Sequence, residues 1–393
     1  SKNKAFFETW SVYPDNNNLD WDEIILNTDI LFLSHVHEDH FDEEFLNRLY
    51  LQNKKVKVLI PDFRFCVLKD KLKKIGFENF ITKELNIGNT RAITYCSETI
   101  DREREDSSIC INDGNLTFLN WNDSTLTPEH KIDIIDKFKK IDWATGQFSG
   151  ATWWPTCYNY TEEKKKGFIS EFKKRKVSHY KRMIEYLGVK KMIPTAGPAC
   201  FLQKNMYHLN NFDDNQSVFF DSWDVSEFND IKEIYRVMTG DIFTYDTIQD
   251  RKSRPFDKKE YILENQYSVD YTLNDDKLKL IDEKIMLKFS SLLENNGWLK
   301  RYIKSKVFIG VKNYKSFCLD FKKQTVEMVD EPIKKGLYYI INFEQKVIYE
   351  LLTKNITDWE NSAFLSCTCT FERNPDVFNP WIVSFFKNLE NDR

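Results

Sequence analysis

The 393-residue sequence lacks the features that would place the protein in a membrane, on nucleic acid or outside the cell. It has no run of 18 apolar residues, so no ordinary membrane-spanning helix is expected. Its first residues lack the uninterrupted apolar core of a signal peptide. Lys and Arg number 57 against 61 Asp and Glu, and the net charge of −4 gives no electrostatic reason to expect nucleic acid or an anionic membrane as partner. We therefore expect a cytoplasmic protein.

The eight cysteines lack the spacing of a cross-linked framework. They are scattered without a CxxC pair, and most lie in apolar or strand-like runs, so we expect reduced and mostly buried thiols. No CxH followed by CxxH occurs, so this chain cannot supply the ligands of a Rieske iron–sulfur cluster. Hydrophobic residues make up 41% and aromatic residues 15%, which is enough for a folded core. A chain of this length exceeds what one core usually supports, which predicts a second domain or a large appendage.

Strands and helices alternate along the first 245 residues. Residues 29–34 and 55–60 are apolar runs that predict strands, and each is followed by a segment with helical spacing. Two later strands are predicted to meet at a two-residue turn formed by Asp113 and Gly114. This alternation predicts an α/β layered domain over residues 1–245.

The pattern changes after a polar stretch near residue 250. Short alternating strands separated by turns predict an antiparallel α+β module over residues 255–393. Before this boundary lies a long basic segment, 161–188, with helical spacing and Gly188 as the expected residue at its end. Its Glu-Lys pairs favour a solvated helix face.

Residues 35–40 read HVHEDH and contain three of the six histidines of the chain. His35 and His37, separated by one residue at the end of a strand, can both turn toward one ion, and Asp39 and His40 are placed to reach a second. Imidazole and carboxylate bind divalent transition metals without a thiolate. The alternative, a polar loop at a helix start, is disfavoured by so many ligands in six positions. The stretch therefore predicts a site for two metal ions.

The HxHxDH motif after an apolar strand resembles the signature of the metallo-β-lactamase superfamily. The resemblance implies an αββα sandwich with one or two metals at the sheet edges, and Asp123, at the end of "LNWND", as the ligand that bridges them. The stretches "SSICINDGNLTFLNWND", "FSGATWWPTCY" and "FERNPDVF" are similar to the CMP-N-acetylneuraminate hydroxylase family and its bacterial relatives. Near the start, "FFETW" resembles a strand that follows the first hairpin of that fold. A sandwich that lacks this first hairpin is therefore an alternative.

No histidine lies between His40 and Asp123, where hydrolases of the superfamily carry one. The acidic stretch "SETIDREREDSS" stands there instead. Di-iron oxygenases of this fold use a glutamate about 25 residues before the bridging aspartate, which makes Glu98 the first candidate and Glu103 the second. Most of the carboxylates of the stretch are expected to be solvated. Oxygen-rich coordination favours iron or manganese over zinc.

Two further sets of residues complete the predicted site. His208 is the candidate for the last metal ligand, the alternative being a structural histidine bonded to a backbone carbonyl. Trp153, Trp154 and Tyr158 are candidates for an apolar wall over the substrate, and packing beneath a helix is the alternative.

The resemblance and the acidic stretch together predict a di-iron, oxygen-dependent hydroxylase or oxidase of an N-acylated or nucleotide-linked small molecule. Asp39 and Asp123 would serve catalysis, O2 would be the co-substrate, and electrons would come from a separate iron–sulfur partner of Rieske or ferredoxin type. For a nucleotide substrate, the resemblance suggests the basic helix from Lys164 to Arg182 as the place to meet its phosphate. The alternative is a zinc- or manganese-dependent hydrolase of an amide or a phosphoester. A non-catalytic module would require a degenerate motif, and HxHxDH is complete.

Overall fold

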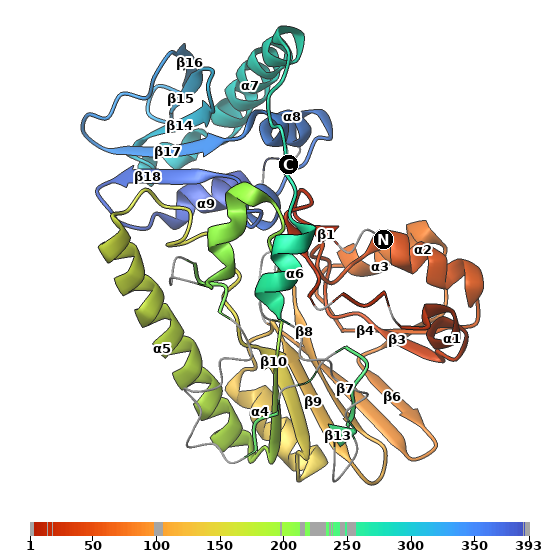
Figure 1. The fold of residues 1–393 in the computed structure, drawn as a ribbon. Coiled ribbons are helices and arrows are strands. Elements are labelled where there is room, and N and C mark those ends of the chain that lie inside the picture. The colour runs from red at the N-terminus through yellow and green to blue at the C-terminus, as the bar shows by residue number, and fades with distance from the viewer. Residues whose placement is uncertain are drawn as a thin grey trace.

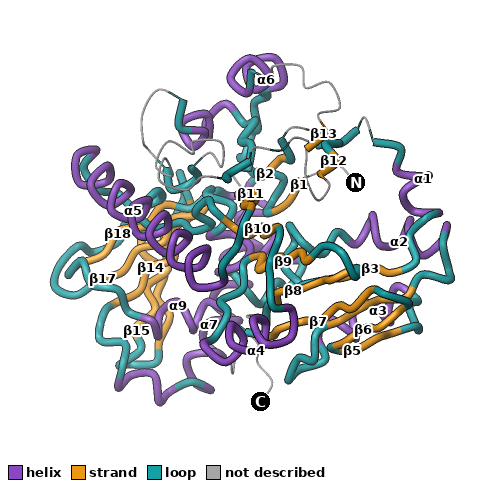
Figure 2. Tube along the Cα trace, turned by 90° about the horizontal axis from the view of Figure 1, so that it is seen from below, coloured by secondary structure: helices purple, strands orange, loops and turns teal. Residues whose placement is uncertain are grey.

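The structure is a computed structural model, in which residues 4–13, 15–17, 19–97, 105–196, 199–212, 217–220, 233–235, 237, 239–243, 248–249, 257–387 and 389 are described. Two layered parts are visible in Figure 1. We call residues 21–195 the sandwich and residues 275–389 the C-terminal module. Seen from below in Figure 2, the strands of the C-terminal module lie to one side of those of the sandwich.

The sandwich contains two sheets. The smaller sheet is parallel and has the order β3 (Ile30–Phe32), β4 (Lys57–Ile60), β5 (Phe80–Thr82). The larger sheet has the order β11 (Lys191–Thr195), β10 (Trp143–Gln147), β9 (Thr117–Asn122), β8 (Ser107–Asn112), β7 (Thr90–Cys96), β6 (Glu84–Ile87). Its strands β9, β10 and β11 are parallel, whereas β6 to β9 are antiparallel neighbours.

Helices cover the outer faces of both sheets (Figure 1). They are α1 (Trp21–Leu26), α2 (Glu43–Gln52) and α3 (Val67–Ile75) on the smaller sheet, and α4 (Pro128–Phe138) and α5 (Glu162–Leu187) on the larger one. Alternation along β4 explains the layers, because Val58 and Ile60 pack with the helices while Leu59 packs with Ala92 and Ile109 of the other sheet. The predicted αββα sandwich is confirmed by these four layers.

The turn between β8 and β9 lies one residue later than predicted. The carboxylate of Asp113 accepts hydrogen bonds from the backbone N–H groups of Asn115 and Leu116 at 2.8 and 2.7 Å. The N–H of Asp113 in turn donates to the carbonyl of Leu116 at 3.2 Å. Asp113 is therefore the residue before the tight turn, and Gly114, with φ of 96°, is its first residue.

The C-terminal module is a five-stranded sheet with helices. The sheet order is β16 (Thr325–Val329), β15 (Ser316–Asp320), β14 (Lys306–Val311), β17 (Tyr338–Phe343), β18 (Thr370–Asn374). Its helices are α7 (Asp275–Asn295), α8 (Gln345–Thr353) and α9 (Pro380–Lys387), with a 3₁₀ turn η4 (Gly297–Arg301) and a π-helical turn η5 (Glu360–Phe364). The prediction of an α+β module is confirmed, but the expected all-antiparallel pairing is wrong, because the central strands β14 and β17 are parallel.

The remaining short elements lie outside these two parts of the sequence. These are the strands β1 (Lys4–Ala5), β2 (Trp10–Ser11), β12 (Ile242–Phe243) and β13 (Ile248–Gln249), the 3₁₀ helix η2 (Lys204–Asn210) and the helix α6 (Lys258–Asn265). Ile262 of α6 packs with Cys200 and Leu202, which follow the last strand of the sandwich. The domain boundary expected between residues 245 and 255 stays a prediction.

The loop before α5 joins the sandwich to the C-terminal module. The hydroxyl groups of Tyr158 and Tyr339 are 2.6 Å apart, and the N–H of Phe371 donates to the carbonyl of Cys157 at 2.8 Å. From the other side, Trp10 Nε1 donates to the carbonyl of Leu365 at 2.9 Å. These contacts bring the segment around η5 next to the edge of the sandwich.

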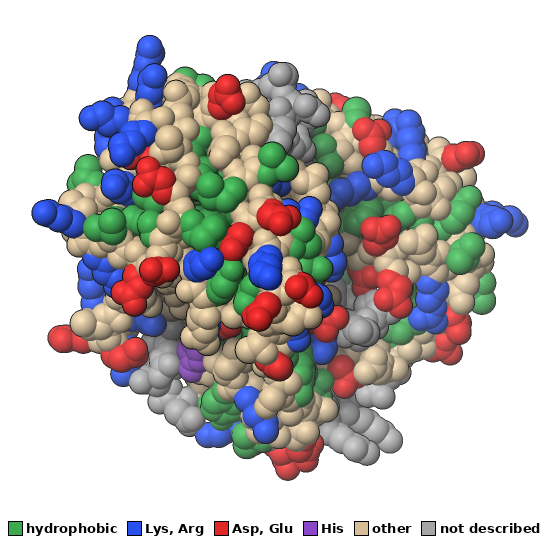
Figure 3. All heavy atoms as spheres, turned by 90° about the horizontal axis from the view of Figure 1, so that it is seen from above, with side chains coloured by type: hydrophobic (Ala, Val, Ile, Leu, Met, Phe, Trp, Pro, Cys, Tyr) green, Lys and Arg blue, Asp and Glu red, His purple; other side chains and the backbone are tan. Residues whose placement is uncertain are grey.

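One face of the molecule, seen in Figure 3, carries Lys and Arg interspersed with Asp and Glu, with hydrophobic side chains between them. No continuous basic surface is visible on that face. Among the described residues, no helix is both long and apolar enough to cross a membrane.

Candidate metal centre

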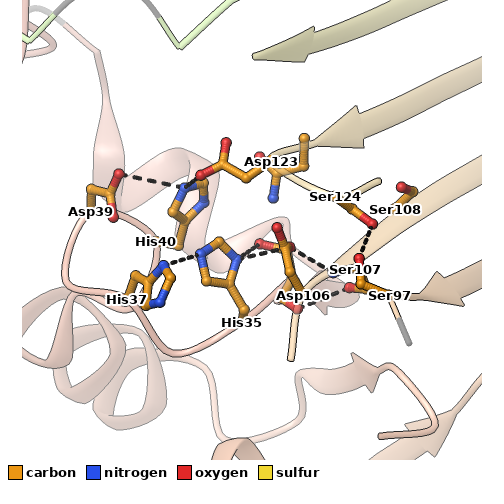
Figure 4. A network of polar contacts seen from close by, with 12 residues as sticks. His35, His37, Asp39, His40, Ser97, Asp106, Ser107, Ser108, Asp123 and Ser124 are labelled. Atoms are coloured by element: carbon orange, nitrogen blue, oxygen red, sulfur yellow. Dashed lines mark hydrogen bonds and ion pairs between the residues drawn. The ribbon is translucent and has the colours of Figure 1, made fainter. Parts of the chain in front are cut away.

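The HxHxDH motif lies in the loop between β3 and α2, as its sequence predicts. Leu33, Val36 and Phe41 of this loop are buried in the core beneath the helices, which ties the loop down at three points. The helix then begins at Asp42, whose side chain accepts a hydrogen bond from the N–H of Phe45 at 2.9 Å. Asp39 and His40 of this loop lie beside Asp123, which follows β9 (Figure 4).

His35 and His37 face each other. The Nε2 atom of His35 lies 2.9 Å from the Nδ1 atom of His37. The other nitrogen of His35, Nδ1, is held by Asp106 Oδ1 at 3.1 Å and by Ser34 Oγ at 3.0 Å (Figure 4). Since a carboxylate on one ring nitrogen orients an imidazole toward a metal with the other, Asp106 presents Nε2 of His35 to the space shared with His37.

His40 forms a second group with two aspartates. Its Nε2 atom lies 3.6 Å from Asp39 Oδ2 and 3.4 Å from Asp123 Oδ2 (Figure 4). Ligand atoms of His35, His40 and Asp123 all lie within 4.8 Å of one another, so Asp123 is close to a histidine of each group. The second oxygen of Asp123, Oδ1, is buried and has no hydrogen-bond partner among the described residues.

The electrostatics of the site keep His37 neutral and Asp123 ionised. Burial, together with the nearby rings of His35 and His40, lowers the pKa of His37 to about 3. Burial also acts to lower the pKa of His40, but the hydrogen bond to Asp123 and the charges of Asp39, Asp123 and Asp106 outweigh it and raise this pKa to about 9. Burial acts to raise the pKa of Asp123, and His40 lowers it overall. His37 and Asp123 are therefore in the protonation states that bind metals, whereas His40 has to release a proton when a metal ion binds.

The spacing of these atoms fits divalent metal ions. Two donor atoms bound to one ion at about 2.1 Å, with an angle of about 90° to 109° between them, lie about 3.0 to 3.4 Å apart. The separations of 2.9 Å between His35 and His37, and of 3.4 and 3.6 Å around His40, are close to these values. The unpartnered Oδ1 of Asp123 is the further donor that a bridging ligand needs.

The other predicted ligands lie outside this cluster or outside the described residues. Glu98 and Glu103 belong to the segment 98–104, which is not among the described residues. His208 is in η2, where its electrostatic neighbours are Lys165 and Glu162 of α5. No group of three or more candidate ligands found in the described residues includes His208. The roles of all three residues stay predictions.

A cavity of about 650 Å³ opens over the cluster. Its lining includes His37, Asp39 and Asp123, and also Trp153 and Trp154 of the predicted substrate wall. The predicted ligands therefore face a space that a small molecule can enter.

The third member of the predicted wall does not line that cavity. Tyr158 is buried against Phe371, and its hydroxyl contacts that of Tyr339 in the C-terminal module. In this structure Tyr158 packs between the two parts of the molecule.

Four residues of the cavity lining could not be assigned from the sequence pattern. Asp106 precedes β8 directly, yet only the packing of the sheets brings it to His35. Lys176 comes from the basic helix α5, whose charged residues resemble a solvated face. Glu360 and Asn361 come from η5 of the C-terminal module, far along the chain, where no local motif marks them.

Comparison with known proteins gives relatives along the whole chain. A family model described as "Rv3818-like, SCP2-like domain" matches residues 281–393. The chain is 28% identical over 432 residues to the "Putative Rieske 2Fe-2S iron-sulfur protein Rv3818" of Mycobacterium tuberculosis (strain ATCC 25618 / H37Rv), covering all of this chain and 80% of the relative. A relative from Mycolicibacterium smegmatis, named in the same way, has the same identity and coverage.

Solved structures similar to this chain are metallo-β-lactamase-fold enzymes. CmlA beta-hydroxylase has a TM-score of 0.39 and 16% identity, and the match covers 58% of this chain and 47% of CmlA. The isothiocyanate hydrolase from Delia radicum gut bacteria has a TM-score of 0.35 and 12% identity, covering 61% and 88%. Tm1679, a metal-dependent hydrolase of the beta-lactamase superfamily, has a TM-score of 0.31 and 11% identity, covering 53% and 76%.

Proposed function

We propose that this chain is a dinuclear iron enzyme that uses O2 to oxidise a small molecule. The observation that carries the proposal is the shortage of imidazoles at the site. Of the six histidines, three form the cluster, while His130 caps α4, His179 is exposed on α5 and His208 lies in η2. Apart from the predicted ligand His208, further protein ligands would therefore be oxygen donors, and an oxygen-rich set favours iron or manganese over zinc.

The residues divide into two groups that share one ligand. His35 and His37 would hold one ion, Asp39 and His40 would hold the other, and Asp123 would contact both. Bound iron would supply the reduction of O2, which the side chains of this site cannot perform themselves. Asp106 keeps His35 in position, because it occupies the ring nitrogen that faces away from His37.

The cavity walls determine what reaches the metals. Trp153 and Trp154, together with Leu365 of the C-terminal module, supply apolar surface, and polar side chains also line the cavity. Such a site favours a small molecule that has both an apolar or ring-shaped part and a polar group. An N-acylated or nucleotide-linked metabolite is the substrate class that the sequence predicts.

Electrons would come from an iron–sulfur protein. This chain has no Rieske ligand motif, whereas the relatives that match along its whole length are named as iron–sulfur proteins. A separate Rieske-type or ferredoxin-type donor is therefore part of the proposal.

The test compares metals and oxygen uptake. Protein reconstituted with iron, zinc or manganese is given a chemical reductant, and O2 consumption is followed with an electrode. We expect uptake with iron alone, loss of uptake in His37→Ala, and no change in the matched control His179→Ala, because His179 is exposed on α5. Absence of O2 uptake with iron, together with hydrolysis of an amide or phosphoester by the zinc or manganese form under anaerobic conditions, would instead establish the alternative hydrolase.

A further inference from the structure

A lysine of the basic helix lines the metal cavity. Lys176 is on α5, and it shares the cavity with His37, Asp39 and Asp123. Its Nζ atom donates a hydrogen bond to Oε1 of Gln147 at 3.0 Å. Lys176 forms no ion pair with a carboxylate in the part of the chain that the structure describes. This residue therefore differs from the rest of the basic helix, which the sequence predicts to be a solvated face.

The fold holds this lysine in place. The hydroxyl of Tyr180, one helical turn after Lys176, is buried and donates to the carbonyl of Gly146 at 2.6 Å. This contact fixes α5 across the end of β10, where Gln147 is the last residue. A Cβ atom at Gly146 would lie 1.9 Å from Nε1 of Trp121, so only glycine allows this close packing of the strand. The packing of α5 against the end of β10 therefore determines the positions of Lys176 and Gln147.

The donors of Lys176 are not fully used. An ammonium group has three N–H donors, and here one described protein acceptor, Oε1 of Gln147, is within hydrogen-bond distance. Removing such a cation from water without a counter-charge is unfavourable, and burial accordingly lowers the pKa of Lys176, with the charge of Asp123 acting against this. An anionic oxygen in the cavity would accept a hydrogen bond from the ammonium group and would also supply its counter-charge.

Metal binding would strengthen the attraction of the cavity for an anion. The carboxylate of Asp123 favours the charged form of Lys176. Once Asp123 is a metal ligand, its negative charge is offset by the ions, and it no longer serves as the counter-charge of Lys176. A negatively charged molecule would then be attracted by the metals and by Lys176 together.

We propose that the cavity binds a small anion whose carboxylate or phosphate group contacts Lys176 and whose apolar or ring-shaped part lies against Trp153 and Trp154. Lys176 is in this view a specificity-determining residue, and the amide of Gln147 positions it. The inference deepens the proposed function, since it names the charge of the substrate, and the contact with Lys176 does not depend on the ion being iron.

The experiment uses three probes with one ring. Benzoate, phenyl phosphate and uncharged benzamide are titrated into the full chain loaded with zinc, which is redox-inactive, and heats of binding are measured. We expect at least one of the two anions to bind more tightly than benzamide, and the preference between them identifies the anionic group. Lys176→Met should weaken binding of that anion 10-fold or more and leave benzamide unchanged, because a charge-assisted hydrogen bond is lost.

Matched variants separate charge from structure. Lys174→Met removes an exposed lysine of the same helix and should leave all three titrations unchanged. Lys176→Arg keeps the charge and should keep most of the anion binding, and unchanged benzamide binding by Lys176→Met excludes a folding defect in that variant. Equal anion binding by wild type and Lys176→Met, or binding of benzamide as tight as that of both anions, would overturn the inference.

The outcome is independent of oxygen chemistry. If the iron form consumes no O2 but the zinc form binds the anion through Lys176, the proposed function fails and this inference stands. If the iron form consumes O2 but the binding of neither anion depends on Lys176, the proposed function stands and this inference fails.

Discussion

Replacing Asp123 by Asn tests the electrostatic interaction between Asp123 and His40 at the centre of the site. The substitution keeps the shape of the side chain and removes its charge. In metal-free protein, Asp123 is hydrogen-bonded to His40, whose pKa is about 9 instead of 6.5. This difference corresponds to about 3 kcal/mol, because one pKa unit is about 1.4 kcal/mol. In Asp123→Asn the pKa of His40 should fall toward 6.5, with the charge of Asp39 holding part of the shift.

The sign of the stability effect follows from the raised pKa of His40. A histidine whose pKa is higher in the folded state stabilises the fold fully below pH 6.5, and this contribution is lost as the pH rises through about 9. Metal-free Asp123→Asn should therefore unfold more easily than wild type below pH 6.5, by up to about 3 kcal/mol, with the gap closing toward pH 9.

Two measurements check this prediction. NMR titration of the Cε1 proton of His40 in metal-free protein gives the pKa in each variant, and urea unfolding at pH 6 and pH 9 gives the stability. His179→Ala, which removes an exposed histidine, is the control. An identical titration midpoint for His40 in wild type and Asp123→Asn would refute the proposed contact, and a stability gap that does not change with pH would refute the linkage.

Three other perturbations probe the sheets, the ligand support and a buried acid. Leu59→Ala, in the core between the two sheets, should cost about 2–5 kcal/mol in urea unfolding, while the exposed control Leu51→Ala should cost less than about 0.5; equal costs would contradict the layering. Asp106→Ala should weaken metal binding about 10- to 100-fold in competition with a chromophoric chelator, and Asp106→Asn should lose less, because an acceptor for His35 remains; unchanged affinity in Asp106→Ala would exclude this support. Burial raises the pKa of Asp358 to about 6, so its contribution to stability is complete below about pH 4 and is lost as the pH rises through 6. Wild type should therefore lose about 3 kcal/mol relative to Asp358→Asn between pH 4 and pH 7 in urea unfolding, and a constant difference would disprove the shift.

The sequence pattern predicted the part of the site that lies on one loop, residues 35–40. The spacing of His35, His37, Asp39 and His40 follows from a strand that ends, a loop anchored by buried residues and a helix capped by Asp42. These features are contained within a dozen residues, so the sequence is sufficient to place the four side chains on one loop.

Contacts between distant segments could not be predicted in the same way. Asp106 meets His35 because two sheets pack face to face, and Glu360 reaches the cavity because the C-terminal module docks on the sandwich. Lys176 lies among residues that look solvated, and its orientation depends on where Tyr180 anchors the helix. The parallel pairing of β14 and β17 likewise depends on the path of the chain between them, which the alternation of apolar residues does not encode.

The most direct test of the central claim is the metal content of protein purified aerobically without added metal, measured by elemental analysis together with its optical spectrum. The proposed site predicts close to two iron ions per chain in the wild type and a marked loss in His37→Ala. Stoichiometric zinc with no iron, or iron retained in full by His37→Ala, would contradict it.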